Sequence, residues 1–380
     1  MGTSDGTVLG TTKVVDHGAD ESKWCLLIAG DGFTSSEQST FQVAVGNFVT
    51  YLEDHLTGPV NWEKVNVIRL DVESDESGVD TSTAAVDTYF DASLGSGDVE
   101  RGLTINQTTA IDAANAQFPE WDAMLVLVNT TEYAGAAVIG GVGAASLEPT
   151  LGNAIATHEL GHCGFGLADE YNYLKGCDHD GGPYDDLGTQ DAYPNSSGEP
   201  VEPNVTSNIF ALKWSSFVDP TTQIPTTTNS DCTQCDPQIS ADGVVGAYEG
   251  AFHYHCHIWR PEFSCTMRLI ELPFCTVCEA HIGNVLTWGS ELDITPCFVA
   301  GAVYGDRRHP DVLALQRWRD RHLAPGSRGR PAMRLLVAAY GCVGPYLATL
   351  AGRHRGLGRL LRRCLISPAA AAARRANGRP

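Results

Sequence analysis

The chain has 380 residues, 43% of them hydrophobic, and 46 acidic against 25 basic side chains give it a formal net charge of −21. Most of the acidic excess lies in residues 1–300, which hold 43 Asp and Glu against 9 Lys and Arg. A body of this charge repels polyanions, which excludes nucleic acid as a partner. The length is sufficient for one main domain of about 250 residues with an appendage.

Helix and strand patterns alternate in the first third of the chain. Apolar runs at 24–29, 65–72 and 123–128 predict three strands. The spacing of Thr34 and Glu37 is that of a capping box and predicts a helix that continues to about residue 56. A second helix is predicted over 108–118. This β-α-β-α-β order is typical of an α/β fold.

The next helix-compatible segment, residues 154–162, ends in His-Glu-Leu-Gly-His. A spacing of four residues places His158 and His162 on one helical face, where both imidazoles can bind one cation. Neutral imidazoles suit Zn²⁺, and Glu159 is placed to accept a proton from a water that the metal acidifies. A bare motif of this kind also occurs on ordinary surface helices. The residues that follow therefore decide its meaning.

Two glycines, Gly164 and Gly166, are expected to end this helix and to bring a carboxylate back to the metal. We predict Asp169 as the third ligand, with Glu170 as the alternative. A different interpretation of this acidic pair is a solvated turn or a calcium site, because four further aspartates follow. They are Asp178, Asp180, Asp185 and Asp186.

Residues 172–242 are rich in Gly, Pro, Asn, Asp and Thr, which predicts loops held by disulfides or ions. The chain has 12 cysteines, and such a number favours disulfides and an oxidising compartment. The pairs Cys232-x-x-Cys235 and Cys275-x-x-Cys278 could also form a zinc knuckle. The 39 residues between the pairs exceed the usual spacing of about 15–20, so disulfides are the preferred prediction.

Three alternating histidines, His253, His255 and His257, predict a strand with histidines on one face. A second metal bound by them is the less favoured interpretation. Another role for one of them is to donate a hydrogen bond to the oxyanion that forms beside the zinc.

The composition changes near Thr295, where an arginine-rich tail begins: residues 301–380 hold 16 arginines, no lysine and 3 acidic residues. We predict a domain boundary between residues 295 and 296, with helices over 312–323 and 332–350. Such helices suit a partner protein or a membrane surface, although solvated arginines are the simpler interpretation.

No stretch of the sequence reaches the roughly 20 apolar residues of a membrane-spanning helix. The first residues also lack the basic and apolar regions of an export signal. The cysteine content nevertheless favours a secreted or cell-envelope protein.

The His158–His162 motif, the stretch Gly-Leu-Ala-Asp-Glu-Tyr at 166–171 and Cys265-Thr266-Met267-Arg268 together resemble the IgA-specific zinc metalloendopeptidase family of bacteria. The likeness extends over roughly residues 10–290, and further matching stretches include Asn204-Val205-Thr206. It implies an α/β (α+β) zincin or metzincin-like catalytic domain with a small helical C-terminal appendage.

Within this resemblance Met267 matches the methionine of the metzincin turn and would form a hydrophobic floor beneath the zinc, not a ligand. The third ligand of metzincins usually lies six residues after the second histidine, where this chain has Ala168. Asp169 and Glu170 therefore both remain candidates. The tail, which opens with Cys297-Phe298-Val299, resembles the CFI-box C-terminal domain of exported bacterial proteins and so implies a sorting or attachment role.

We therefore predict a secreted endopeptidase with one catalytic Zn²⁺ held by His158, His162 and Asp169, with Glu159 as general base and a protein or peptide as substrate. Cleavage of IgA itself does not follow from the motif. An alternative is a metal-stabilised surface-binding or adhesive module without catalysis, whose acidic body binds calcium or a host protein. A metal hydrolase acting on bonds other than peptide bonds is a further alternative.

Overall fold

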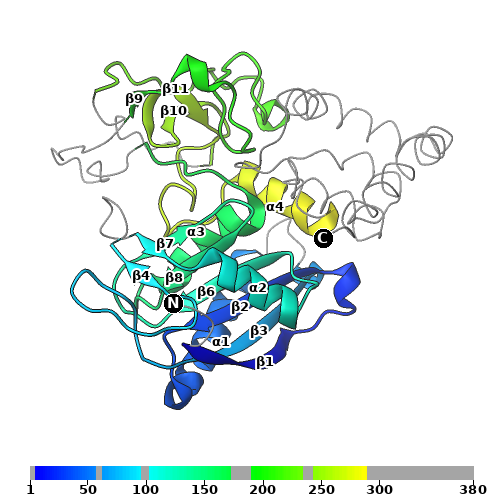
Figure 1. The fold of residues 1–380 in the computed structure, drawn as a ribbon. Helices are drawn as coiled ribbons and strands as arrows, with labels where there is room; N and C mark the ends of the chain where they lie inside the picture. Colours follow the sequence, from blue (N-terminus) through cyan, green and yellow to red (C-terminus); the bar gives the residue numbers. More distant parts are fainter. Residues whose placement is uncertain (1–4, 57–61, 96–101, 173–189, 234–242, 289–380) are drawn as a thin grey trace, which may run out of the picture. The chain divides into compact units, whose positions relative to one another are not determined.

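The computed structural model describes residues 5–56, 62–95, 102–172, 190–233 and 243–288. The chain divides into two units, Met1–Ser290 and Glu291–Pro380, and every described residue belongs to the first unit (Figure 1). The predicted boundary at 295/296 and the predicted helices of the tail lie outside the described residues.

A six-stranded sheet forms the centre of the first unit, in the order β1-β3-β2-β6-β8-β7. The four inner strands are parallel to one another, and both edge strands are antiparallel to their neighbours. In chain order the strands are β1 (Gly6–Val15), β2 (Trp24–Asp31), β3 (Val65–Ser74), β6 (Ala123–Val128), β7 (Gly135–Ala137) and β8 (Val142–Ser146).

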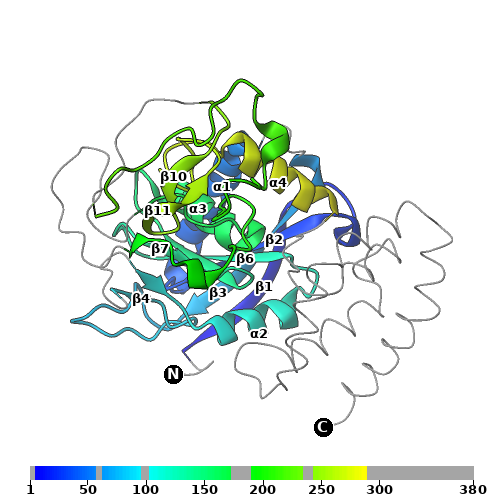
Figure 2. The same cartoon turned by 90° about the horizontal axis from the view of Figure 1, so that it is seen from above.

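Helices cover both faces of this sheet, as the view from above shows (Figure 2). Leu26 and Ile28 of β2 point to the face that packs against α1 (Gln38–His55) and α3 (Gly152–Phe165). Leu27 and Ala29 point to the other face, which α2 (Gln107–Gln117) covers. Because both faces are buried, β2, β6 and β8 are apolar over almost their whole length, whereas β3 carries Asn66, Arg69, Asp71 and Glu73.

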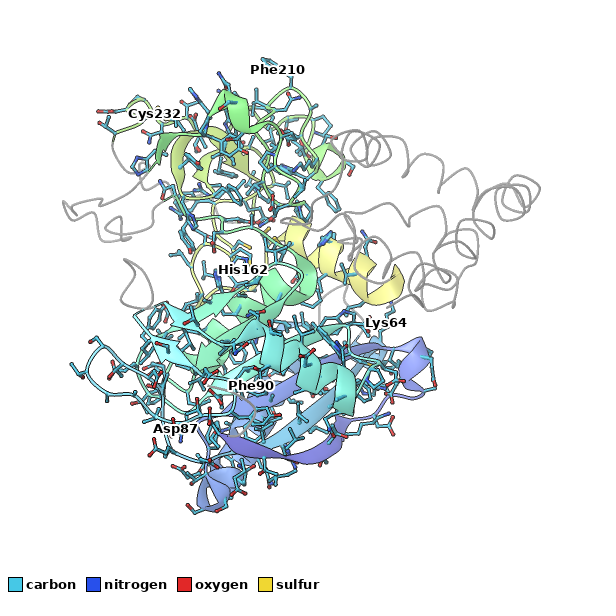
Figure 3. The ribbon with its side chains drawn as sticks, in the orientation of Figure 1. Lys64, Asp87, Phe90, His162, Phe210 and Cys232 are labelled. Atoms are coloured by element: carbon cyan, nitrogen blue, oxygen red, sulfur yellow. A yellow bond between two sulfur atoms is a disulfide. The ribbon has the colours of Figure 1, made fainter. Side chains whose placement is uncertain are left out.

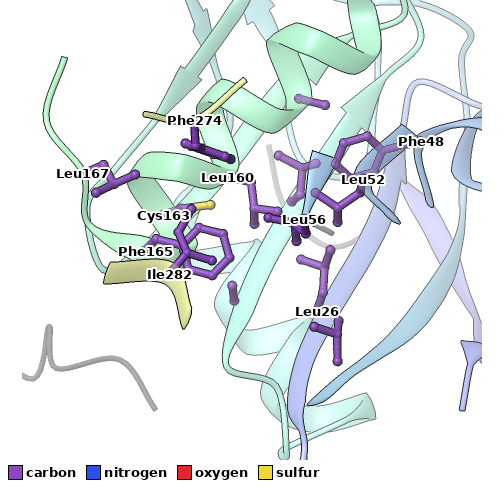
Figure 4. Close-up of a cluster of buried hydrophobic side chains, with 14 of the residues drawn as sticks. Leu26, Phe48, Leu52, Leu56, Leu160, Cys163, Phe165, Leu167, Phe274 and Ile282 are labelled. Atoms are coloured by element: carbon purple, nitrogen blue, oxygen red, sulfur yellow. The ribbon is translucent and has the colours of Figure 1, made fainter. Parts of the chain in front are cut away.

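The larger core joins the sheet to α1, α3 and the start of α4 (Thr276–Trp288). Figure 4 shows Leu26 of the sheet, Leu52 of α1, Leu160 of α3 and Ile282 of α4 as members of this one cluster. The helix that carries the His-Glu-Leu-Gly-His sequence is therefore fixed between the sheet and α4.

A second, three-stranded sheet lies on the other side of α3 (Figure 1). It comprises β10 (Tyr248–Ala251), β11 (Tyr254–Arg260) and β9 (Gln190–Ala192), in the order β10-β11-β9. A disulfide between Cys232 and Cys256 ties the preceding loop to β11. The remaining strands, β4 (Ser93–Leu94) and β5 (Leu103–Thr104), form a separate pair.

The predicted α/β order and the elements from 24 to 128 are confirmed. The capping box is present as well, because Thr34 donates its backbone N–H to Glu37 Oε2 at 3.0 Å and a short 3₁₀ turn then leads into α1. β1, β7 and β8 are not among the predicted strands. β7 and β8 consist mostly of glycine and alanine and therefore lack the usual strand composition, whereas β1, rich in Thr and Val, has it. Within the described part of the chain, no helix is long and apolar enough to cross a membrane.

Candidate metal centre

The histidine motif lies at the end of α3, which stops one turn later. Gly166 adopts a left-handed conformation (φ +62°) and its N–H bonds the carbonyl of His162, while Leu167 N bonds Gly161 O. This is the arrangement in which a glycine ends a helix and reverses the chain. The predicted glycine stop is therefore present at Gly166, and it directs residues 167–171 back past the helix.

Three side chains meet at this reversal: His158, His162 and Asp169. The Nε2 atoms of the two histidines are 3.2 Å apart, and each lies 3.1 Å from Asp169 Oδ1. Figure 3 shows His162 on α3, between the large sheet and the segment that carries β9 to β11. Ligand atoms around a tetrahedral zinc, with bonds of about 2.0–2.1 Å, lie about 3.3–3.4 Å apart, so the spacing fits such an ion.

The hydrogen bonds of the other ring nitrogens identify the atoms that face the centre. His158 Nδ1 lies 2.9 Å from Thr266 O and His162 Nδ1 lies 2.6 Å from Leu167 O, and a carbonyl can only accept. In the neutral rings, both Nδ1 atoms therefore carry the proton and both Nε2 atoms present lone pairs. Two lone pairs and a carboxylate oxygen that converge in this way repel one another unless a cation lies between them. The three residues thus fit a metal ion.

The charges of the centre agree with this need for a cation. Burial opposes a positive charge on His162, but the adjacent Asp169 carboxylate outweighs burial and raises the pKa of His162 to about 9. Burial would likewise raise the pKa of Asp169, yet the three surrounding histidines hold it well below its usual range. In the absence of a metal a proton supplies the positive charge, so a metal ion has to displace that proton.

Glu159 follows His158 on α3 and is nearly buried, with 7% of its surface exposed. Strand β7 runs against it, so closely that a Cβ atom added to Gly135 would lie 2.6 Å from Glu159 Oε1. Only glycine at this position leaves room for the carboxylate. Gly135 could not be predicted from the sequence, because a glycine in an alanine-rich stretch gives no signal of what packs against it.

Asp169 is held on both sides by residues far away in the sequence. Its second oxygen, Oδ2, lies 3.1 Å from His253 Nε2. The preceding residue, Ala168, is fixed by Asn204, whose side chain accepts from Ala168 N and donates to Ala168 O. Asn204 was noted only as part of a matching stretch and His253 only as a metal or oxyanion candidate; neither pattern revealed that they position the Asp169 loop.

Glu170 turns away from the histidines although it is the next residue. Its side chain is fully buried and accepts hydrogen bonds from Asn204 Nδ2 at 2.9 Å and from Cys278 Sγ at 3.3 Å. Burial raises the pKa of Glu170 well above its usual range, and the charge of Cys265 adds to this increase. The interpretation of Asp169 and Glu170 as a solvated turn is wrong, because Glu170 is fully buried and the Asp169 side chain is only 15% exposed. The four aspartates from Asp178 to Asp186 lie outside the described residues.

Met267 packs beneath the histidine helix and is completely buried. A Cβ atom on Gly161 would lie 2.5 Å from Met267 Sδ, so the glycine between Glu159 and His162 is what allows this contact. The backbone of the same turn is bonded to the centre: Thr266 O accepts from His158, and Met267 O accepts from Glu170 N at 2.7 Å.

The three alternating histidines do not share one face of a strand. β11 begins at Tyr254, and His257 has a positive φ of +63°, which interrupts the alternation. As a result His255 is buried and bonds Cys232 O, His257 is exposed, and His253 alone reaches Asp169. The prediction that they lie on one face is therefore wrong. Among the described residues, the candidate metal groups include none of the three.

The predicted disulfides are confirmed for only one of the cysteines named in the two pairs. Cys232 is bonded to Cys256, and its predicted neighbour Cys235 lies outside the described residues. Cys275 and Cys278 are buried thiols and are not disulfide-bonded; together with Cys265 and Glu170 they form a second group of potential metal ligands. The reason is geometric, since the Cys275 and Cys278 thiols lie within 4.8 Å of Cys265, whereas Cys232 is bonded to Cys256.

The family described as IgA peptidase M64 matches residues 12–241, which include α3 and the Asp169 loop but not Met267 or the buried cysteines near α4. A search of curated proteins found no match to this chain.

Proposed function

Because the chain belongs to the IgA peptidase M64 family, we propose that it is a zinc-dependent endopeptidase with Glu159 as its general base. Membership of a peptidase family indicates a protein substrate. The observation that carries the proposal is the convergence of Asp169, from the loop after α3, on His158 and His162 of α3, the helix that also carries Glu159. Whether IgA is cleaved is a property of the substrate-binding loops and is not part of the proposal.

Zinc is the metal that best suits this set of ligands. Two imidazole nitrogens and one carboxylate oxygen are typical of zinc sites that keep a fourth position for water or substrate. When bound, zinc supplies a Lewis acid that polarises the scissile carbonyl and acidifies the attacking water. Asp169 is preferred to Glu170 as the third ligand because its Oδ1 lies 3.1 Å from both Nε2 atoms.

Glu159 moves the proton in this reaction. Its carboxylate takes a proton from the attacking water and later delivers it to the leaving amine of the cleaved peptide bond. The close approach of Gly135 restricts the movement of the Glu159 side chain, which keeps the carboxylate on the histidine helix. His253 acts as a positioning residue, since its hydrogen bond to Asp169 Oδ2 fixes the orientation of the carboxylate.

We propose that the substrate binds along the edge of β7. This strand is the last in the sheet order and lies against α3 next to Glu159. Ala134 O and Val138 N bond β8, so alternation along an antiparallel pair directs the N–H groups of Gly135 and Ala137 away from β8. An extended peptide that pairs with those groups would pass in front of Glu159.

Export to an oxidising compartment is the proposed localisation, supported by the disulfide between Cys232 and Cys256. For residues 296–380 we propose a sorting or attachment role at a membrane surface or partner protein. That role is supported by their arginine-rich composition and their resemblance to the CFI-box domain.

Metal removal followed by restoration tests the proposal. The full chain is incubated with casein and with immunoglobulin, and new amino termini are identified by mass spectrometry before chelation, after chelation and after zinc is added back. We expect internal cleavage that chelation abolishes and zinc restores. Cleavage that persists in metal-free protein would contradict zinc dependence, and zinc-loaded protein that cleaves neither substrate would favour the non-catalytic binding module.

A further inference from the structure

A second cluster of potential metal ligands lies beside the histidine centre. It consists of Glu170, Cys265, Cys275 and Cys278, whose ligand atoms all lie within 4.8 Å of one another. The four come from three separate segments: the loop after α3, the turn before Met267, and the start of α4. All four residues are buried, so the cluster is closed to solvent.

The distances in this cluster fit a metal site better than they fit a disulfide. Cys265 Sγ and Cys278 Sγ are 3.8 Å apart, and Cys278 Sγ is 3.3 Å from Glu170 Oε1. Sulfurs bound to a tetrahedral zinc at about 2.3 Å lie about 3.8 Å apart, and a sulfur and an oxygen lie about 3.5 Å apart. A disulfide instead requires a separation of about 2.05 Å.

The surroundings of these atoms also indicate a cation. Glu170 Oε2 is buried and has no hydrogen-bond partner among the described residues, although Oε1 accepts from Asn204. Cys265 Sγ accepts the backbone N–H of Cys275 at 3.3 Å, an interaction that stabilises a thiolate. A buried carboxylate oxygen next to three sulfurs carries a large desolvation cost unless a positive ion shares the site.

We propose that Glu170, Cys265, Cys275 and Cys278 bind a second, structural zinc ion. Three thiolates select a soft borderline metal such as zinc, and four protein ligands leave no position for water or substrate. Arg260 contributes positive charge near Glu170 and offsets part of the negative charge of the ligands. This site is separate from the catalytic function, and its ligands differ from those of the histidine centre.

The position of the second ion gives it a function. Glu170 is adjacent to Asp169, and Cys265 lies two residues before Met267 and one before Thr266, whose carbonyl accepts from His158. An ion that joins these segments to α4 would fix the positions of Asp169, of the Thr266 carbonyl that orients His158, and of Met267 beneath the histidines. The second zinc would therefore preorganise the first.

Metal counting in the full chain tests this proposal directly. We expect the wild type, purified without chelators, to contain two zinc ions per chain. The double variant His158→Ala/His162→Ala should retain one, because it removes ligands of the histidine centre only. A double variant that contains no zinc would overturn the proposal. A disulfide between two of the three cysteines, found by mass spectrometry of the wild type, would overturn it as well.

Cobalt provides a spectroscopic test that does not depend on catalysis. Protein produced with Co²⁺ in place of zinc should show a thiolate-to-cobalt charge-transfer band in the near ultraviolet, and the double histidine variant should keep it. Cys278→Ala should lose the band, whereas Cys25→Ala, which removes a buried thiol of β2, should not. Absence of the band from cobalt-loaded wild type would show that the cysteines do not bind the metal. Because neither test measures hydrolysis, failure of this proposal and failure of the peptidase proposal are distinguishable.

Discussion

The histidine centre and the cysteine cluster each take one of two adjacent residues, Asp169 and Glu170, yet their chemistry differs. Asp169 faces two imidazoles, whereas Glu170, the next residue, faces three sulfurs. Side chains at the histidine centre keep some exposure, 15% for Asp169, whereas Glu170, Cys265 and Cys278 have none. Three ligands with access to solvent suit catalysis, and four closed ligands suit a structural ion.

One short segment links the two groups of ligands. Cys265 belongs to the cysteine cluster, the carbonyl of Thr266 holds His158, and Met267 packs against Gly161 of the histidine helix. A substitution that shifts this segment at the cysteine cluster should therefore also shift the residues that contact the histidine centre. The comparison teaches that a metal-binding motif of five residues depends on a second site almost 100 residues later in the sequence.

The largest effect should come from removing a ligand of the open centre. His162→Ala should lower kcat/KM for a peptide substrate by at least about 1000-fold, because loss of metal polarisation removes several kcal/mol of transition-state stabilisation. The folded structure should persist, since the cysteine cluster is untouched. His281→Ala is the matched control, as it removes a partly buried imidazole that bonds Phe165 O and belongs to neither group of ligands. Equal losses in both variants would argue for general damage.

Asp31 sharpens the contrast with Glu170, because it is a buried carboxylate whose two oxygens both accept hydrogen bonds from the protein and need no metal ion. It accepts from Phe90 N, Ala92 N, Thr88 Oγ1 and Ser74 Oγ. Burial nevertheless raises the pKa of Asp31 to about 6, against an ordinary value of 3.8.

A raised folded-state pKa favours folding while Asp31 is protonated. That contribution is complete below about pH 4 and is lost as the pH rises through about 6, a change of about 3 kcal/mol in the free energy of unfolding. Urea unfolding from pH 4 to pH 7 should therefore show the stability of the wild type falling relative to Asp31→Asn. A difference that stays constant with pH would contradict the assignment.

Gly161→Ala tests the contact that links the two sites. The added Cβ would lie 2.5 Å from Met267 Sδ, so Met267 and its turn must shift, at a cost of about 1–3 kcal/mol in unfolding free energy. Gly46→Ala on α1 is the control, because nothing lies within 4 Å of its added Cβ, and there the helix should gain about 0.5–1 kcal/mol. Thermal and urea unfolding measure both changes, and the opposite signs are the expected result.

The smallest expected effect concerns the second oxygen of Asp169. His253→Ala should weaken zinc binding about tenfold, because the carboxylate loses the hydrogen bond that orients it. Competition with a fluorescent chelator measures the affinity, and His257→Ala, which removes an exposed imidazole, is the control. An unchanged affinity in His253→Ala would mean that Asp169 is held by the backbone alone.

The central strands, α1, α2 and the histidine helix could be predicted from the sequence because their apolar periods and capping residues are local signals. β7 and β8 could not be predicted, since Gly135 and the alanines around it give no local signal and are stabilised in these strands by their contacts with α3. The sequence favoured Asp169 as the third ligand but left Glu170 as an alternative, and the two are separated only by the directions in which their side chains point after the reversal at Gly166. The cysteine pattern was assigned to disulfides because sequence gives the number of thiols but not their partners.

Glu159→Gln tests the central claim most directly, because the amide has nearly the shape of the carboxylate but cannot accept the proton. Casein hydrolysis and zinc content are measured on wild type and variant prepared in parallel. We predict equal zinc in the two proteins and a rate at least about 1000-fold lower in the variant. Turnover close to that of the wild type, with zinc still bound, would contradict the assignment of Glu159 as the general base.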